Sequence, residues 1–141
     1  YQLILAGVFA MQMQTASAKD TFLDLPVDGA LKSESASALL DVPFFMAGQD
    51  HPAVTKNIGT ATTNRSTNAF NKSNEAAREI AVLSAVIALQ TRAKTDGGNA
   101  VIDIKSITKG NELVSATQFR CVAGAFVARV GLSGASATIA K

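Results

Sequence analysis

The stretch from Ser73 to Leu132 constrains the fold more than any other part of this 141-residue chain. Between Ala76 and Ala88 apolar side chains recur at three- and four-residue steps, which is the spacing of one helix face. Ser73 supplies a helix N-cap, and Gly97-Gly98 ends the helix with a residue suited to left-handed backbone. The helix centre, AVLSAVIAL, is apolar nearly all round. We therefore expect a sheet to cover one side, and a second element or another subunit to cover another.

Two strands are expected after the helix. Asn99–Lys105 predicts a strand with Ala100, Ile102 and Ile104 on one face. A turn at Lys109-Gly110-Asn111 precedes a long strand, Ala116–Leu132, in which Gly124 is a candidate bulge. The glycine- and serine-containing tail after Leu132 is expected to be loose.

The first half of the chain predicts shorter elements. Strands are expected at Asp20–Leu25, Pro43–Ala47 and Ala53–Ile58, and a modest helix at Gly29–Leu40 with Asp28 as its N-cap. Thr60–Ser73 is the most polar segment and predicts a loop or a ragged edge strand, with Phe70 turned inward. Together these elements predict an α+β fold, with one long helix packed on a small mixed or antiparallel sheet.

The N-terminal residues resemble a secretory signal peptide. Residues 1–18 carry no charge, residues 3–11 form a short apolar run, and Ala16-Ser17-Ala18 is an A-x-A cleavage site. The run is too short to span a membrane. We therefore expect cleavage near Ala18, a periplasmic location, and a single domain over residues 19–141.

Composition excludes some classes of function. The net charge of +2 and the absence of tryptophan argue against a nucleic-acid-binding protein. The charge is uneven, because residues 61–141 carry ten Lys or Arg against five acids. This excess of basic residues predicts either an ordinary solvated face or a basic patch that meets an anionic partner.

Catalytic and metal-binding signatures are missing from the sequence. It contains no phosphate-binding loop of the G-x-x-x-x-G-K-[ST] type and no G-x-S-x-G elbow. His51 is the only histidine and Cys121 the only cysteine, and no ligand pair has zinc-type spacing. The sequence therefore predicts neither an enzyme nor a metal or cofactor site. Cys121 is expected to be a buried, inert thiol or, alternatively, a redox-sensing or intermolecular one.

The remaining candidates form a speculative binding set rather than a motif. It combines His51 with residues of the polar segment and one strand arginine: Asn68, Phe70, Lys72 and Arg120. If these side chains converge, they provide a site for a small ligand or a metal.

The segment from Thr67 through GGNAV, followed by FRCVAGAFV, resembles a family of small exported proteobacterial proteins. These are often labelled "excinuclease ATPase subunit", a label that fits neither an export signal nor the missing nucleotide-binding loop. The order of helix, GGNAVI, loop and FRCVAGAFV is also similar to the C-terminal half of the RcsF stress-sensor lipoprotein and to YbjQ proteins. That resemblance implies a helix on a small sheet, and in the YbjQ type a ring. The sensor uses paired cysteines, whereas this chain has only Cys121.

These observations favour a non-enzymatic protein of the cell envelope that binds, senses or supports structure through protein contacts. The partner is expected to be an envelope protein or further copies of the chain. The alternative is a periplasmic protein that binds a small ligand or a metal.

Overall fold

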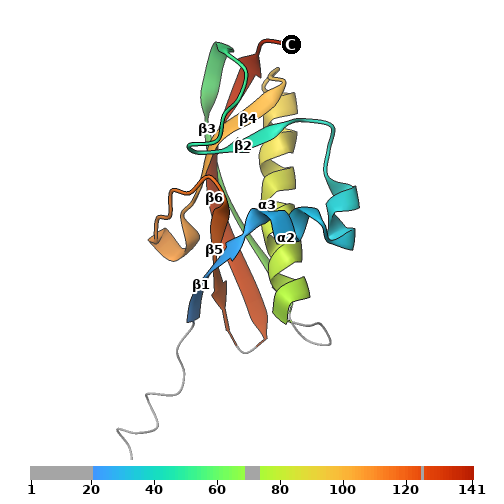
Figure 1. The fold of residues 1–141 in the computed structure, drawn as a ribbon, viewed down its shortest axis with the longest axis vertical. Helices are drawn as coiled ribbons and strands as arrows, with labels where there is room; N and C mark the ends of the chain where they lie inside the picture. Colours follow the sequence, from blue (N-terminus) through green and yellow to red (C-terminus); the bar gives the residue numbers. More distant parts are fainter. Residues whose placement is uncertain (1–20, 69–73, 125) are drawn as a thin grey trace, which may run out of the picture.

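The computed structural model describes residues 21–68, 74–124 and 126–141, and it shows a mixed α/β architecture (Figure 1). One long helix, α3 (Asn74–Thr95), lies on a six-stranded sheet. The strands are β1 (Thr21–Pro26), β2 (Phe44–Met46), β3 (Val54–Asn68), β4 (Ala100–Ser106), β5 (Gln118–Ala123) and β6 (Val127–Ile139). Short helical pieces complete the fold: α2 (Val27–Leu31), η1 (Glu34–Ala38) and η2 (Thr108–Gly110). The sheet is mixed because β2 runs parallel to β4, whereas the other pairs are antiparallel.

Strand β6 is the centre of the sheet. On one flank it pairs with β3 along its whole length, from Val127 opposite Asn68 to Ile139 opposite Val54. The other flank is divided between two strands, since β5 pairs with its first residues and β4 with Leu132–Ala137. Beyond these, β1 pairs with β5 and β2 with β4. Strand β3 is therefore an edge strand.

The main core lies between the sheet and α3. Side chains of α3 such as Val82, Val86 and Leu89 pack with Ile104 and Leu132 from the sheet, all of them buried. The opposite face of the sheet carries a smaller cluster: Ala100, Ile102, Ala135, Ala137 and Ile139, with Phe45 against it. Burial of such side chains removes apolar surface from water and stabilises both layers.

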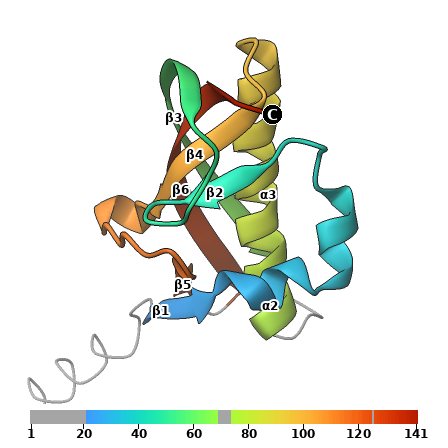
Figure 2. The same ribbon diagram turned by 45° about the horizontal axis from the view of Figure 1, so that its top comes forward.

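The sheet covers one side of the apolar helix α3, and a second side is covered by other elements of the same chain. Figures 1 and 2 show α2 and η1 beside α3, on the side away from the start of β3. Gln90, which is buried on α3, fixes the segment after η1. Its side chain accepts a hydrogen bond from the Leu40 N–H (3.0 Å) and donates to the carbonyls of Leu40 (3.0 Å) and Val42 (2.8 Å).

The glycine stop after α3 is confirmed. Gly97 has a φ of +86°, and the Gly98 N–H donates to the Ala93 carbonyl at 2.8 Å, as expected for a Schellman-type end. A Cβ on Gly98 would lie 2.7 Å from the Ala137 carbonyl oxygen, so this position also allows helix end and sheet to meet. No helix among the described residues is both long and apolar enough to cross a membrane.

Of the two alternatives for Thr60–Ser73, a loop or a ragged edge strand, the structure shows an edge strand for the first part, and the loop is wrong there. Strand β3 continues through Gly59 as far as Asn68, because each residue from Gly59 onward lies opposite a residue of β6. Threonine is favourable in strands, and the ladder to β6 outweighs the local hydrogen bonds that these polar side chains offer. Phe70, Lys72 and the Ser73 cap lie outside the described residues.

The prediction of one strand from Ala116 to Leu132 is also wrong. The chain reverses after Ala123 and forms the β5–β6 hairpin, in which Ala123 lies opposite Ala128. Gly124 belongs to this reversal and is not a bulge within a strand. The supposedly loose tail is the buried second half of β6. There a Cβ on Gly134 would lie 2.9 Å from Val101 Cγ1, so only glycine leaves room for that neighbour.

Two further predictions need correction. A bulge at Asp103, which has a φ of +54°, reverses the facing of β4, so Val101 and Ile104 pack toward α3 and Ile102 toward the opposite face.

The single helix predicted over Gly29–Leu40 is instead α2 followed by the 3-10 turn η1. Helix α2 begins at Val27 after Pro26, so Asp28 lies in its first turn and does not cap it. Ser33 ends it by donating its hydroxyl to the Ala30 carbonyl at 2.7 Å.

Candidate functional site

The open edge of β3 is the candidate site. Strand β3 has 15 residues and, within the described part of the chain, pairs only with β6. In an antiparallel ladder the N–H and C=O of one residue point to the same side, and successive residues alternate between the two sides. About half of the β3 residues therefore direct their backbone groups away from β6.

Hydrogen bonds on the far flank of β6 identify these residues. The carbonyls of Val127, Gly131 and Ala137 accept bonds on the β4–β5 side, from Gly124, Ile107 and Asn99 at 2.8, 2.8 and 3.0 Å. The even-numbered residues of β6 therefore face β3, and their partners there include Ala61, Thr63 and Arg65. It follows that four intervening residues direct both backbone groups to the open edge: Thr60, Thr62, Asn64 and Ser66.

A groove runs between this edge and α3. Its main part has a volume of about 500 Å³, and an adjoining part along the helix has about 350 Å³. On the helix side the walls include the half-buried residues Ser84, Ile87 and Ala88, which neither the sheet nor the α2–η1 segment covers fully. On the strand side the walls are residues 61–65. The groove therefore joins unpaired backbone with a partly apolar helix face.

One polar atom in the groove wall lacks a partner. Thr63 is only 7% exposed and points toward α3, and its hydroxyl makes no hydrogen bond in the described structure. Burying a hydroxyl without a partner costs about 1–3 kcal/mol. The other such atom within residues 21–68, 74–124 and 126–141 is Arg78 Nε, near the start of α3. Thr63 therefore offers a donor that a molecule in the groove could satisfy.

The ribbon formed by β3 and β6 is basic. It contains Lys56, Arg65 and Arg129 and no acidic residue. Arg65 lies at the open edge, where its Nη1 donates to the Asn64 carbonyl at 3.1 Å, one of the outward-directed groups. Charge at an edge strand hinders unspecific strand pairing. The same charge favours an acidic partner over a basic one.

The structure does not bring the speculative binding set together. His51 lies before β3, where its Nδ1 is 2.8 Å from the Pro52 carbonyl and its ring centroid is 5.6 Å from that of Phe45. Asn68 lies at the other end of β3, so roughly 45 Å of strand separates the two regions. Phe70 and Lys72 lie outside the described residues.

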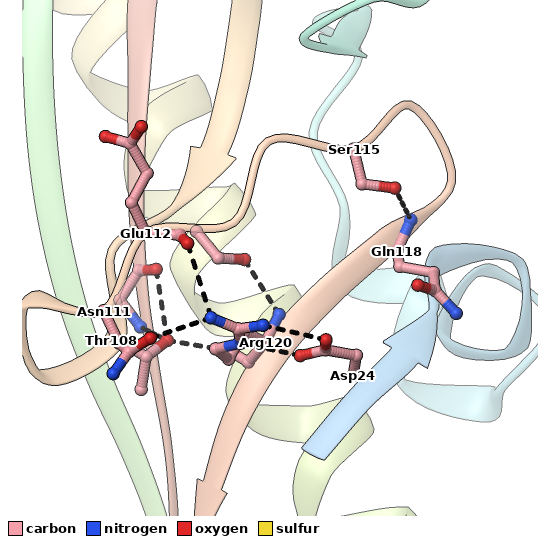
Figure 3. A network of polar contacts seen from close by, with 9 residues as sticks. Asp24, Thr108, Asn111, Glu112, Ser115, Gln118 and Arg120 are labelled. Carbon is pink, nitrogen blue, oxygen red and sulfur yellow. Dashed lines mark hydrogen bonds and ion pairs between the residues drawn. The ribbon is translucent and has the colours of Figure 1, made fainter. Parts of the chain in front are cut away.

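Arg120 takes part in a structural network on the β1–β5 side (Figure 3). Its guanidinium binds the Asp24 carboxylate through two bonds of 2.7 and 2.9 Å, and it donates to Asn111 Oδ1 at 2.8 Å. The arginine hydrogen bonds lower the pKa of Asp24, whereas desolvation opposes that shift. With 21% of its side chain exposed, Arg120 fastens β1 and the loop before β5 instead of facing the β3 edge.

Cys121 is buried, which confirms the burial that its apolar neighbours predict. Its Sγ is 3.6 Å from the Val122 carbonyl oxygen, and burial raises the pKa of the thiol. Thiols with a raised pKa react slowly. In the part of the chain that the structure describes, no three His, Cys, Asp or Glu side chains are grouped closely enough to hold a metal.

For Thr60–Ser66 the sequence left a loop and a ragged edge strand open, and it did not predict that these residues form a long, regular open edge. A signal was present, since this stretch contains neither glycine nor proline and four of its seven residues are threonine or serine. Their polarity predicts a loop, whereas the β-branched shape of the three threonines favours a strand. Comparison with family models, curated proteins and solved structures finds no match to this chain.

Proposed function

We propose that this protein is a non-enzymatic binding module that takes an extended segment of another protein as an added strand on β3. The observation that carries the proposal is the row of outward backbone groups on Thr60, Thr62, Asn64 and Ser66. Strand addition uses such groups for affinity and adjacent pockets for specificity. The groove beside α3 supplies the pockets, and the Thr63 hydroxyl supplies a donor.

The charge of the edge favours an acidic segment of a different protein over a second copy of this chain. Two copies joined through β3 would bring two ribbons together, each with Lys56, Arg65 and Arg129 and no acid. Like charges across strands destabilise pairing, whereas opposite charges stabilise it. A carboxylate on the incoming strand could draw Arg65 from the Asn64 carbonyl and so free that acceptor for the new ladder.

The proposal places this binding in the cell envelope. It draws on the uncharged residues 1–18 with their A-x-A site, which support export and cleavage near Ala18. It also draws on the resemblance of the helix, GGNAVI and FRCVAGAFV order to the RcsF and YbjQ proteins. The partner is then an exported protein or the exposed segment of an envelope protein.

Selection from a displayed library of random peptides tests the proposal. We expect enrichment of β-favouring peptides that carry Asp or Glu, with a dissociation constant in the micromolar range, about 1–100 μM, as for short strand-adding segments. Thr62→Pro removes an outward N–H without removing a bond to β6, so it should weaken binding at least tenfold. Thr62→Val keeps that N–H and is the matched control.

Three results would contradict the proposal. The first is the absence of enriched sequences, and the second is equal binding by the Thr62→Pro and Thr62→Val proteins. The third is a concentration-dependent dimer in light scattering that Thr62→Pro dissociates, which would assign the edge to a second copy. Backbone hydrogen exchange supplies a direct readout, since bound peptide should protect Thr62 and Asn64 more than the already paired Thr63.

A further inference from the structure

The side chains of β3 alternate between the two faces of the sheet. Thr63 and Arg65 lie opposite Leu132 and Val130 of β6, which belong to the main core beside α3. Side chains of directly paired residues project to the same face. Thr63 and Arg65 therefore project toward α3, whereas the residues next to them in the strand project to the opposite face.

This alternation determines which side chains of an added strand meet those of β3. In antiparallel addition, the incoming residues opposite Thr62 and Asn64 exchange backbone hydrogen bonds with them. The incoming residues opposite Thr63 and Arg65 form the pairs without hydrogen bonds, in which the Cα atoms are only about 4.5 Å apart and the side chains are closest. Two incoming side chains, two positions apart, therefore enter the groove beside α3.

Arg65 favours a carboxylate on the incoming residue opposite it. Its one hydrogen bond among the described residues is to the Asn64 carbonyl at 3.1 Å. Arg92, the other arginine that lines the groove, is already paired with Asp96 at 2.9 Å. The half-buried Ile87 lies beside Arg65 and offers an apolar surface to the methylene groups of a glutamate. Glutamate therefore suits this position better than the shorter aspartate.

Thr63 favours a threonine on the incoming residue opposite it. The Thr63 side chain is 7% exposed, and its hydroxyl has no hydrogen-bond partner among the described residues. Facing threonines in neighbouring strands form side-chain hydrogen bonds, so an incoming threonine supplies the missing acceptor. Its methyl group then lies toward Ala88, which is half-buried and lines both parts of the groove. A valine at this position would leave the Thr63 hydroxyl without a partner.

We propose that the segment bound by β3 runs antiparallel to it and carries the pattern Glu-x-Thr, with the glutamate opposite Arg65 and the threonine opposite Thr63. This inference rests on the proposed strand addition and names the segment that is added. An antiparallel strand passes Arg65 before Thr63, so the glutamate precedes the threonine, whereas a parallel strand would require Thr-x-Glu. Antiparallel pairing is the more stable type per residue. The residue x projects to the face that carries Thr62 and Asn64, where a polar side chain fits.

Two synthetic peptides of equal composition test the order of the two residues. Each is a short β-favouring peptide, one with Glu-x-Thr and the other with Thr-x-Glu at the same positions. Fluorescence anisotropy with the unsubstituted protein should show binding at least about threefold tighter for Glu-x-Thr. Equal binding, or tighter binding of Thr-x-Glu, would overturn the antiparallel pattern. This comparison does not depend on whether a variant of the protein folds.

Reversal of the charge at Arg65 tests the first pair. Arg65→Glu should bind a Lys-x-Thr peptide more tightly than Glu-x-Thr, with a change of about tenfold in the ratio of the two dissociation constants. Arg129→Glu makes the same change of charge on the same ribbon, but Arg129 does not line the groove, so the preference for glutamate should persist. Circular dichroism of each variant establishes that it is folded.

Removal of the Thr63 hydroxyl tests the second pair. Thr63→Val should lose the preference for Glu-x-Thr over Glu-x-Val that the unsubstituted protein is expected to show. If the peptides bind and protect Thr62 and Asn64 from hydrogen exchange, but Arg65→Glu alters the charge preference no more than Arg129→Glu, the pattern is overturned and strand addition stands. If no peptide binds, the pattern is overturned, and strand addition falls with it when the displayed library also yields no enriched sequence.

Discussion

The two flanks of helix α3 differ in how the polar groups beside them are satisfied. Toward α2 and η1, Gln90 binds both backbone groups of Leu40 and the carbonyl of Val42. Toward β3, the Thr63 hydroxyl is buried and has no hydrogen-bond partner among the described residues, and four residues of the strand direct their backbone groups outward. We call these the closed flank and the open flank.

The difference indicates which flank is built for stability and which is available for binding. A buried polar group with all its partners helps to define one structure, whereas an unpartnered one costs free energy in the unbound state. The closed flank should therefore lose stability when its polar side chain is removed. The open flank should lose binding and gain stability.

The largest effect is expected from proline within β3. Thr63→Pro removes a backbone N–H that faces β6 and directs the ring into the ladder, so we expect a loss of about 3 kcal/mol or more. Thr62→Pro alters only the open edge and should cost less than about 1 kcal/mol. Urea denaturation of both variants measures the difference. Equal losses would show that the alternation of facing along β3 has been assigned wrongly.

Removal of the closed-flank side chain is expected to have the next largest effect. Gln90→Leu keeps the volume but leaves the groups of Leu40 and Val42 without partners, which should cost about 2 kcal/mol in the free energy of unfolding. Thr91→Ala, at the next position on the open side of the helix, removes only an exposed bond to Ile87 and should cost under about 0.5 kcal/mol. If the free energy of unfolding falls no more in Gln90→Leu than in Thr91→Ala, the polar contacts of the closed flank do not stabilise the fold more than those of the open flank.

A gain in stability, instead of a loss, is expected when the Thr63 hydroxyl is removed. Thr63→Val removes the unpartnered hydroxyl and keeps the shape, so the free energy of unfolding should rise by up to about 1 kcal/mol. The same variant should bind selected peptides more weakly. Destabilisation in urea would indicate that the hydroxyl already has a partner in solution.

A smaller effect is expected from acid titration. Because bonds from Arg120 lower the pKa of Asp24 in the folded state, its contribution is present above the ordinary pKa of 3.8 and is lost as pH falls below it. Glu79 acts in the opposite sense. Burial and the nearby Glu75 raise its pKa above 4.5, so its contribution is lost as pH rises through that raised value.

Unfolding at pH 2 to 7 should therefore show a weaker decline below about pH 4 for Asp24→Asn than for the unsubstituted protein. Glu79→Gln should instead gain stability relative to the unsubstituted protein at neutral pH. Because Asp24 is 34% exposed, solvent screening keeps its effect small. Identical acid profiles for all three proteins would mean that the Asp24–Arg120 pair does not stabilise the fold.

Part of this protein was predictable because the evidence is local. The three- and four-residue apolar spacing predicts α3, and the glycine pair predicts its end, since both depend on neighbouring residues alone. The burial of Cys121 and the presence of strands at β1, β2 and β4 also follow from short patterns. The α+β class follows from the order of these elements.

Tertiary structure decided the rest, including the open edge of β3. The polar run from Thr60 to Asn68 is a strand because β6 lies beside it, and nothing local to that run reveals its partner. The same pairing turns a presumed tail into the central strand and leaves one edge of β3 open. Hydrogen bonds between distant strands depend on the whole sheet, and a sequence pattern specifies only the faces of each strand.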